Sequence, residues 1–254
     1  MSSTTIEAHQ ARLADLSDHV SDTAIAAMVY GSYARGTDDE GSDIDILELV
    51  ADSPSPRSSG RINVTQYTPA HLAQMSQRGS LFVMHLIADG KVLHDPHGTL
   101  ERTLSQYAKP VSFAPIWEQL SAAAGIVNPR SPDASEHSHG LGRLGMYVLR
   151  TAAYLHAIEQ GNPCFDVDAA AKRLGVRGLS EVLRWRRSKD FTLDQLSAIA
   201  EVLPRVLPLP VVNEDRSVLS FAVAHSTSQD MAALFMTVLG DGQIEYSALT
   251  VPPF

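Results

Sequence analysis

Apolar and polar residues follow two kinds of pattern over the first 110 residues. Four short segments are apolar or alternate with period two, as strands do; they are residues 24–30, 43–50, 61–67 and 91–95. Three segments have helical patterns or a helix-starting Thr-Pro pair; they are residues 6–20, 68–78 and 80–88. Residues 53–60, rich in Ser and Pro, read as a loop. The pattern predicts a small domain of strands and helices over residues 1–110.

After Pro110 the apolar spacing becomes helical. Gly and Pro residues separate the segments that we expect to be helices: 115–126, 140–160, 166–174, 179–187, 192–206 and 217–239. We therefore predict a mostly helical domain over residues 111–240. Residues 241–254 have no helical pattern and are expected to form a C-terminal tail.

Composition narrows the class of protein. No apolar run approaches the roughly 18 residues of a membrane-spanning helix, and the N-terminus lacks the pattern of a signal peptide. With one cysteine, Cys164, no internal disulfide can form. We expect a cytoplasmic protein without membrane insertion. The net charge of −9 disfavours broad binding to nucleic acids, although it allows a local basic patch.

The strongest chemical signal is Gly31-Ser32-Tyr33-Ala34-Arg35-Gly36 followed by Ser42-Asp43-Ile44-Asp45. A glycine after a buried strand allows close approach of a ligand, and the N-terminus of a following helix favours phosphate. Arg35 adds a cation there. Asp43 and Asp45 are expected on one face of a strand, where two carboxylates can bind Mg²⁺ or Mn²⁺. Two such ions, about 4 Å apart, suit phosphoryl transfer.

This motif resembles the signature of the DNA polymerase β-like nucleotidyltransferases over about residues 20–95. The resemblance implies an α+β fold: a mixed sheet with flanking helices, followed here by the helical domain. It also implies transfer of a nucleoside monophosphate from a triphosphate with release of pyrophosphate, the reaction type of EC class 2.7.7. Asp43 and Asp45 would hold two metal ions, and Gly31, Ser32, Arg35 and Ser42 would bind the triphosphate.

One position departs from the superfamily pattern. Where a third acidic ligand is expected on the next strand, this chain has Asn63, whose amide offers a neutral oxygen. Three interpretations stay open: two carboxylates suffice, another acid such as Glu48 or Asp52 substitutes, or the enzyme is impaired. Against the second, Glu48 should point to the opposite face from Asp45. We favour the first.

The helical domain offers further candidates. Arg143, Tyr147 and Arg150 share a helix face and would meet the triphosphate or its base. Arg150 and His156 have the spacing of HEPN-type ribonucleases, a weak signal. Residues 172–189 hold seven basic residues and one acid around Trp185, which suits either phosphate and base binding or a solvated face with a core tryptophan.

Tyr246 lies in the C-terminal tail, and a docked tail would bring its hydroxyl to the metals as an acceptor. The overall plan is similar to Hailong-type anti-phage defence nucleotidyltransferases. That resemblance implies dATP, or otherwise ATP, as substrate, a short single-stranded DNA product primed on Tyr246, and a membrane channel as effector partner. The alternatives are a toxin or antitoxin enzyme acting on tRNA or a protein, an antibiotic nucleotidyltransferase, and a non-catalytic nucleotide-binding module.

Overall fold

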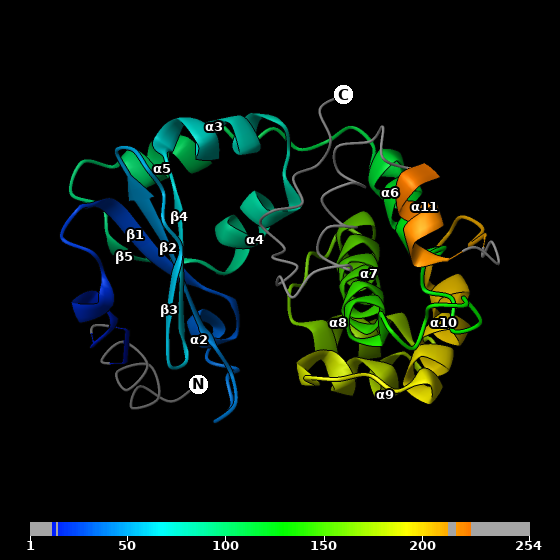
Figure 1. Ribbon diagram of the computed structural model, residues 1–254. Coiled ribbons are helices and arrows are strands. Elements are labelled where there is room, and N and C mark those ends of the chain that lie inside the picture. Colours follow the sequence, from blue (N-terminus) through cyan, green and yellow to red (C-terminus); the bar gives the residue numbers. More distant parts are fainter. Residues whose placement is uncertain (1–11, 14, 213–216, 225–254) are drawn as a thin grey trace. The chain divides into compact units, whose positions relative to one another are not determined.

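The computed structural model describes residues 12–13, 15–212 and 217–224 (Figure 1). The chain divides after Pro110 into two compact units, which we describe separately. Residues 1–110 hold the sheet, and the helical unit begins at Val111. Tyr246 and the rest of the expected tail lie outside the described residues.

The first unit is built on a mixed five-stranded sheet. Its strands are β1 (Ala24–Tyr30), β2 (Ile44–Val50), β3 (Arg57–Ser59), β4 (Ile62–Tyr67) and β5 (Lys91–His94). The order is β3-β4-β2-β1-β5; β2 and β4 are parallel, and the other neighbours are antiparallel. The mixed sheet and its flanking helices confirm the α+β fold expected from the sequence. β3 lies where we expected only a loop. The sequence did not indicate this strand because its three residues are polar and exposed and carry no apolar signal.

Short helices flank this sheet. They are the 3-10 helix η1 (Asp15–His19), α2 (Gly31–Arg35), α3 (Pro69–Gln77), α4 (Leu81–Asp89) and α5 (Thr99–Leu104). The hydroxyl of Thr68 accepts a hydrogen bond from the His71 N–H, 3.2 Å away, so this residue caps α3 as expected. The sequence did not indicate α5, because its first turn is capped by Asp95, which is not the adjacent residue: the carboxylate accepts from the N–H groups of Thr99 and Leu100.

The two faces of the sheet have different coverings. On one face, the Phe82 ring of α4 lies edge-on to Tyr30 at 5.5 Å and to Tyr67 at 6.1 Å between ring centroids. On the other face, Val29 packs with Leu16, next to η1 and α2. The first face is the one that carries Asp45, because Asp45 is the register partner of Tyr30.

The described part of the second unit, residues 111–212 and 217–224, is mostly helical, as expected. Its helices are α6 (Ala114–Ala124), α7 (Ser138–Glu159), α8 (Val167–Leu174), α9 (Leu179–Leu183), the 3-10 helix η2 (Arg184–Arg187), α10 (Leu193–Val206) and α11 (Val218–Ala224). The long helix α7 is central and contacts α6, α8, α9 and α10. Two glycines permit its close packing: a Cβ on Gly142 would lie 2.1 Å from Phe191, and one on Gly145 would lie 2.5 Å from Ile199.

Within the described ranges, no helix combines the length and the apolar character needed to cross a membrane.

Candidate active site

Two glycines bound the short helix after β1. Gly31 has φ +77° and Gly36 has φ +70°, both in the left-handed region that favours glycine. Gly36 ends α2, and its N–H donates to the Tyr33 carbonyl at 3.1 Å. Tyr33 and Ala34 are buried, whereas Ser32 and Arg35 stay partly exposed. The GSYARG motif therefore forms a tight turn and one helical turn directly after a buried strand.

Asp45 lies beside this turn. It is the second residue of β2, and its register partners are Tyr30 on β1 and Asn63 on β4. A Cβ built on Gly31 would lie only 3.2 Å from the Asp45 Oδ2 atom. The backbone of the glycine turn is therefore close to the Asp45 carboxylate.

Asp43 comes one residue before the strand begins, not on it as expected. Its side chain is exposed, while that of Asp45 is partly buried. Asp45 is therefore on β2, whereas Asp43 belongs to the loop that leads into the strand.

The loop before Asp43 is fixed by its own polar groups and by Arg61. The hydroxyl of Ser42 donates to the Asp39 carboxylate and accepts from the Asp39 N–H, both at 2.9 Å. The Arg61 guanidinium donates to the backbone carbonyls of Ser42, at 2.7 Å, and of Asp39, at 2.9 Å. Ser42, expected to bind substrate, is buried and bonds within this loop. Arg61 was missed, because nothing in the sequence ties it to a loop so far upstream.

Asn63 occupies the position beside Asp45 where a third acid was expected. Its side-chain oxygen accepts a hydrogen bond from the Ser58 hydroxyl on β3 at 2.7 Å. Among the residues that the structure describes, no cluster of three or more His, Cys, Asp or Glu side chains is arranged to hold a metal. Beside Asp45, β4 therefore presents the neutral Asn63 amide instead of a third acid.

The two alternative acids lie elsewhere. Asp52 is exposed beyond the far end of β2. Glu48 belongs to the face opposite Asp45, as its odd spacing predicted, and its register partners are Ala27 and Gln66. Neither carboxylate joins the Asp43–Asp45 pair.

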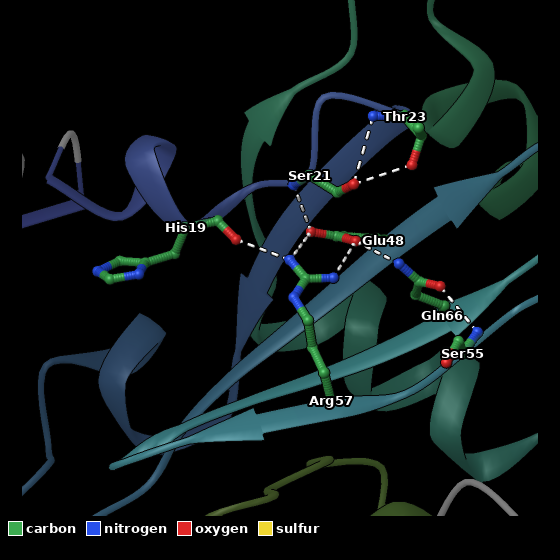
Figure 2. A network of polar contacts seen from close by, with 7 residues as sticks. All are labelled: His19, Ser21, Thr23, Glu48, Ser55, Arg57 and Gln66. Atoms are coloured by element: carbon green, nitrogen blue, oxygen red, sulfur yellow. Dashed lines mark hydrogen bonds and ion pairs between the residues drawn. The ribbon is translucent and has the colours of Figure 1, made fainter.

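Glu48 is instead the centre of a buried network (Figure 2). Its side chain is fully buried, and its carboxylate accepts two hydrogen bonds from Arg57, at 2.7 and 2.9 Å. Gln66 and the Ser21 N–H donate to it as well, at 2.7 and 2.8 Å, while Arg57 also donates to the His19 carbonyl. Burial alone would raise the pKa of Glu48, but these hydrogen bonds and the Arg57 charge hold it below its usual value.

A second ion pair ties α2 to α4. Arg35 contacts the Asp89 carboxylate at the end of α4, and the His85 Nε2 atom is 3.2 Å from the same carboxylate. Burial would raise the pKa of Asp89, but the neighbouring His85 and the hydrogen bond from Arg35 lower it. Arg35, expected to be a phosphate-binding cation, is thus also a link that fixes the position of α2. Asp89 was missed because it ends the apolar helix α4 without belonging to any motif.

The candidates in the helical unit lie along α7. Arg143, Tyr147 and Arg150 are partly exposed, although most residues between them are buried. Burial lowers the pKa of Arg143. His156, by contrast, has a structural environment: its Nε2 atom is 2.7 Å from the Val206 carbonyl, and its ring contacts Trp117. These contacts account for His156 without a ribonuclease role.

Comparison with known proteins supports the nucleotidyltransferase superfamily. Residues 13–74 match the family model described as "Nucleotidyltransferase domain". The matched region contains the glycine turn, both aspartates and Asn63. A search of curated proteins found no significant match. A nucleotidyltransferase-like protein from Exiguobacterium sibiricum 255-15 is 14% identical and has a TM-score of 0.31; the alignment covers 78% of this chain and 74% of that protein.

Proposed function

We propose that this protein is a metal-dependent nucleotidyltransferase whose reaction centre is the Gly31 turn and the Asp43–Asp45 pair. The observation that carries the proposal is the short approach between Gly31 and the Asp45 carboxylate. It brings the turn suited to phosphate next to Asp45, one of the two carboxylates that would bind metal. The family match over residues 13–74 supports transfer of a nucleoside monophosphate in general.

The donor atoms suit Mg²⁺ or Mn²⁺. Asp43 and Asp45 supply carboxylate oxygens, and Asn63 adds a neutral one beside Asp45. When bound, two such ions would neutralise phosphate charge and favour the deprotonated form of an attacking hydroxyl. Because Asn63 carries no charge, we expect weaker metal binding than at a site with three acids.

In this proposal, some of the remaining residues position the reaction centre and others bind the substrate. Gly31 would let the backbone approach the triphosphate, and the Arg35–Asp89 ion pair ties α2 to α4. Ser42 and Arg61 fix the loop that leads to Asp43. Ser32 and Arg35 would contact the triphosphate. In the helical unit, Arg143, Tyr147 and Arg150 would bind the triphosphate or base, because two cations and an aromatic ring line one partly exposed stripe of α7.

The finer proposal concerns the acceptor. We propose Tyr246 as the primer for a short single-stranded DNA product made from dATP, in a cytoplasmic anti-phage defence enzyme whose product regulates a membrane channel. It is supported by the plan of the chain and the position of Tyr246 near the C-terminus. A non-catalytic nucleotide-binding module is the second candidate, and the neutral Asn63 favours it.

The test is to incubate the purified protein with each labelled NTP or dNTP and Mg²⁺, and to separate the products on a denaturing gel. We expect pyrophosphate release and labelled product that disappear when Asp43→Ala and Asp45→Ala are combined. Asp22→Ala with Asp52→Ala is the matched control, because it removes two exposed carboxylates from the same unit. Retained transfer in the Asp43/Asp45 variant would refute the proposed centre.

The acceptor is tested on the same gel. Label attached to the protein and lost in Tyr246→Phe supports self-priming, whereas label unchanged by that substitution excludes Tyr246 as acceptor. No label and no pyrophosphate release with any nucleotide or candidate acceptor would favour the binding module.

A further inference from the structure

The basic segment at residues 172–189 forms one region of the helical unit. It comprises the end of α8, the turn before α9, α9 itself and η2, and these consecutive elements contact one another (Figure 1). The segment holds seven of the 20 Lys and Arg residues of the chain and one of its 29 acidic residues. Most of the cations are exposed: Lys172, Arg173, Arg177, Arg184, Arg187 and Lys189. We call this region the basic surface.

Structural roles account for part of this charge. Arg186 makes two hydrogen bonds to Asp168 of α8, at 2.9 and 3.2 Å, and so holds η2 against that helix. Lys172 and Arg173 lie in the last turn of α8, where cations are favourable. No ion pair within the described ranges involves Arg177, Arg184 or Lys189. Like charges concentrated in this way repel one another and attract anionic partners.

An aromatic ring lies among these cations. Trp185 is partly exposed in η2 and is flanked by Arg184 and Arg186. It is not a fully packed core residue, unlike Trp117, which is 5% exposed and donates a hydrogen bond to Glu159. Cations next to an accessible aromatic face are the features with which proteins bind single-stranded nucleic acids: phosphates contact the cations, and bases stack on the ring.

We infer that the basic surface binds single-stranded nucleic acid, with a base stacked on Trp185 and the flanking phosphates on Arg177, Arg184 and neighbouring cations. A single strand fits better than a duplex because only single strands expose base faces to stack on a side chain. The acidic remainder of the chain repels long polymers, which favours short strands. The binding surface stands by itself; that it holds the acceptor or product of transfer rests on the proposed function.

The first test is fluorescence anisotropy with a labelled 12-nucleotide single strand, as DNA and as RNA, and no triphosphate or metal present. In single-strand binding, each neutralised phosphate contributes about 0.7 to the slope of log affinity against log salt. Combining Arg177→Ala with Arg184→Ala should lower that slope by about 1.4. Arg130→Ala with Arg205→Ala removes the same charge from exposed positions elsewhere in this unit and should leave the slope unchanged.

The second test uses the two tryptophans of the chain. Bound oligonucleotide should quench tryptophan fluorescence in the wild-type protein but not in Trp185→Phe, because only the buried Trp117 remains. Trp185→Phe keeps an aromatic face and should bind, whereas Trp185→Leu should lose roughly tenfold in affinity. A merely structural tryptophan would make both variants bind alike.

Three results would overturn the inference: no binding of single strands, equal loss of slope in the matched control, or tighter binding to vesicles of anionic phosphatidylglycerol than to single strands. The Asp43/Asp45 double variant should bind like the wild type. Binding without transfer would therefore refute the proposed reaction alone, and transfer to Tyr246 without binding would refute the basic surface alone.

Discussion

Removing Arg57 should leave a buried carboxylate without its charge partner. In the Arg57→Met variant, the fully buried Glu48 side chain keeps its hydrogen bonds from Gln66 and Ser21 and loses two from the guanidinium. Breaking a buried ion pair costs about 3–5 kcal/mol. Because the Arg57 side chain is 41% exposed, solvent screens part of the interaction, and we expect a loss of about 2–3 kcal/mol from the free energy of unfolding.

Hydrogen exchange followed by mass spectrometry is the suitable assay. Both tryptophans, Trp117 and Trp185, lie in the helical unit, so tryptophan fluorescence does not report unfolding of the sheet. At pH 7, protection of the amides in β2 and β4 should fall about 30- to 150-fold, since one pKa unit, or a factor of ten, corresponds to about 1.36 kcal/mol. Amides of α7 should keep their protection.

The pH dependence supplies a sharper check. In the wild type, the pKa of Glu48 is below its usual value of 4.5, so its stabilisation is present above that value and is lost as pH falls through the folded pKa. Without Arg57, the effect of burial dominates and raises the pKa of Glu48. Lowering the pH then protonates Glu48 and removes the unpaired buried charge, so the variant is destabilised less. The stability difference between the two proteins should therefore shrink between pH 7 and pH 4.

Two further variants isolate the buried charge. Adding Glu48→Gln to Arg57→Met removes the unpaired carboxylate and should recover much of the lost stability. Arg186→Met breaks another ion pair with two hydrogen bonds, that between Arg186 and Asp168. Because the Asp168 side chain is 62% exposed, we expect the free energy of unfolding to fall by less than about 1 kcal/mol. A pH-independent difference, or a double variant as unstable as Arg57→Met, would refute this account of Glu48.

The proposed reaction centre yields two more predictions. Gly31→Ala forces a side chain into a left-handed conformation beside the Asp45 carboxylate, so the transfer rate should drop while the fold persists at a cost of about 1–2 kcal/mol; normal transfer would refute the proposed approach of backbone and substrate. Asn63→Asp keeps an acceptor for Ser58 and adds a charge beside Asp45, so the Mg²⁺ concentration for half-maximal transfer should fall about tenfold; an unchanged requirement would place Asn63 outside the metal site.

The sequence predicted elements whose signal is local. Apolar runs identified β1 and β2, the Thr68-Pro69 pair marked the start of α3, and period-two spacing separated Glu48 from Asp45. β3 and α5 were missed because β3 is a short polar edge strand and α5 depends on the carboxylate of Asp95. Such elements can be recognised only from the structure, which shows the strand that pairs with β3 and the residue that caps α5.

At the site, the contacts that the sequence did not predict also depend on residues far apart in the chain. Gly31 and Asp45 are close in sequence, and their approach followed from a strand, a turn and a second strand. The partners of Arg35 and Ser42 could not be read in that way. Asp89 is 54 residues from Arg35, and Arg61 is 19 residues from Ser42, so both contacts depend on how the chain returns to the sheet.

β2 carries Asp45 on one face and Glu48 on the other, and this arrangement affects whether the strand pairs in the correct register. A slip of one residue in the pairing of β2 would turn Asp45 away from its face and bring Glu48 there instead. In a slipped strand, the Glu48 carboxylate could not meet its donors from β3, β4 and the segment before β1 together. The buried Glu48–Arg57 pair therefore favours the native register of β2, which is also the register that places Asp45 on the Tyr30 face of the sheet.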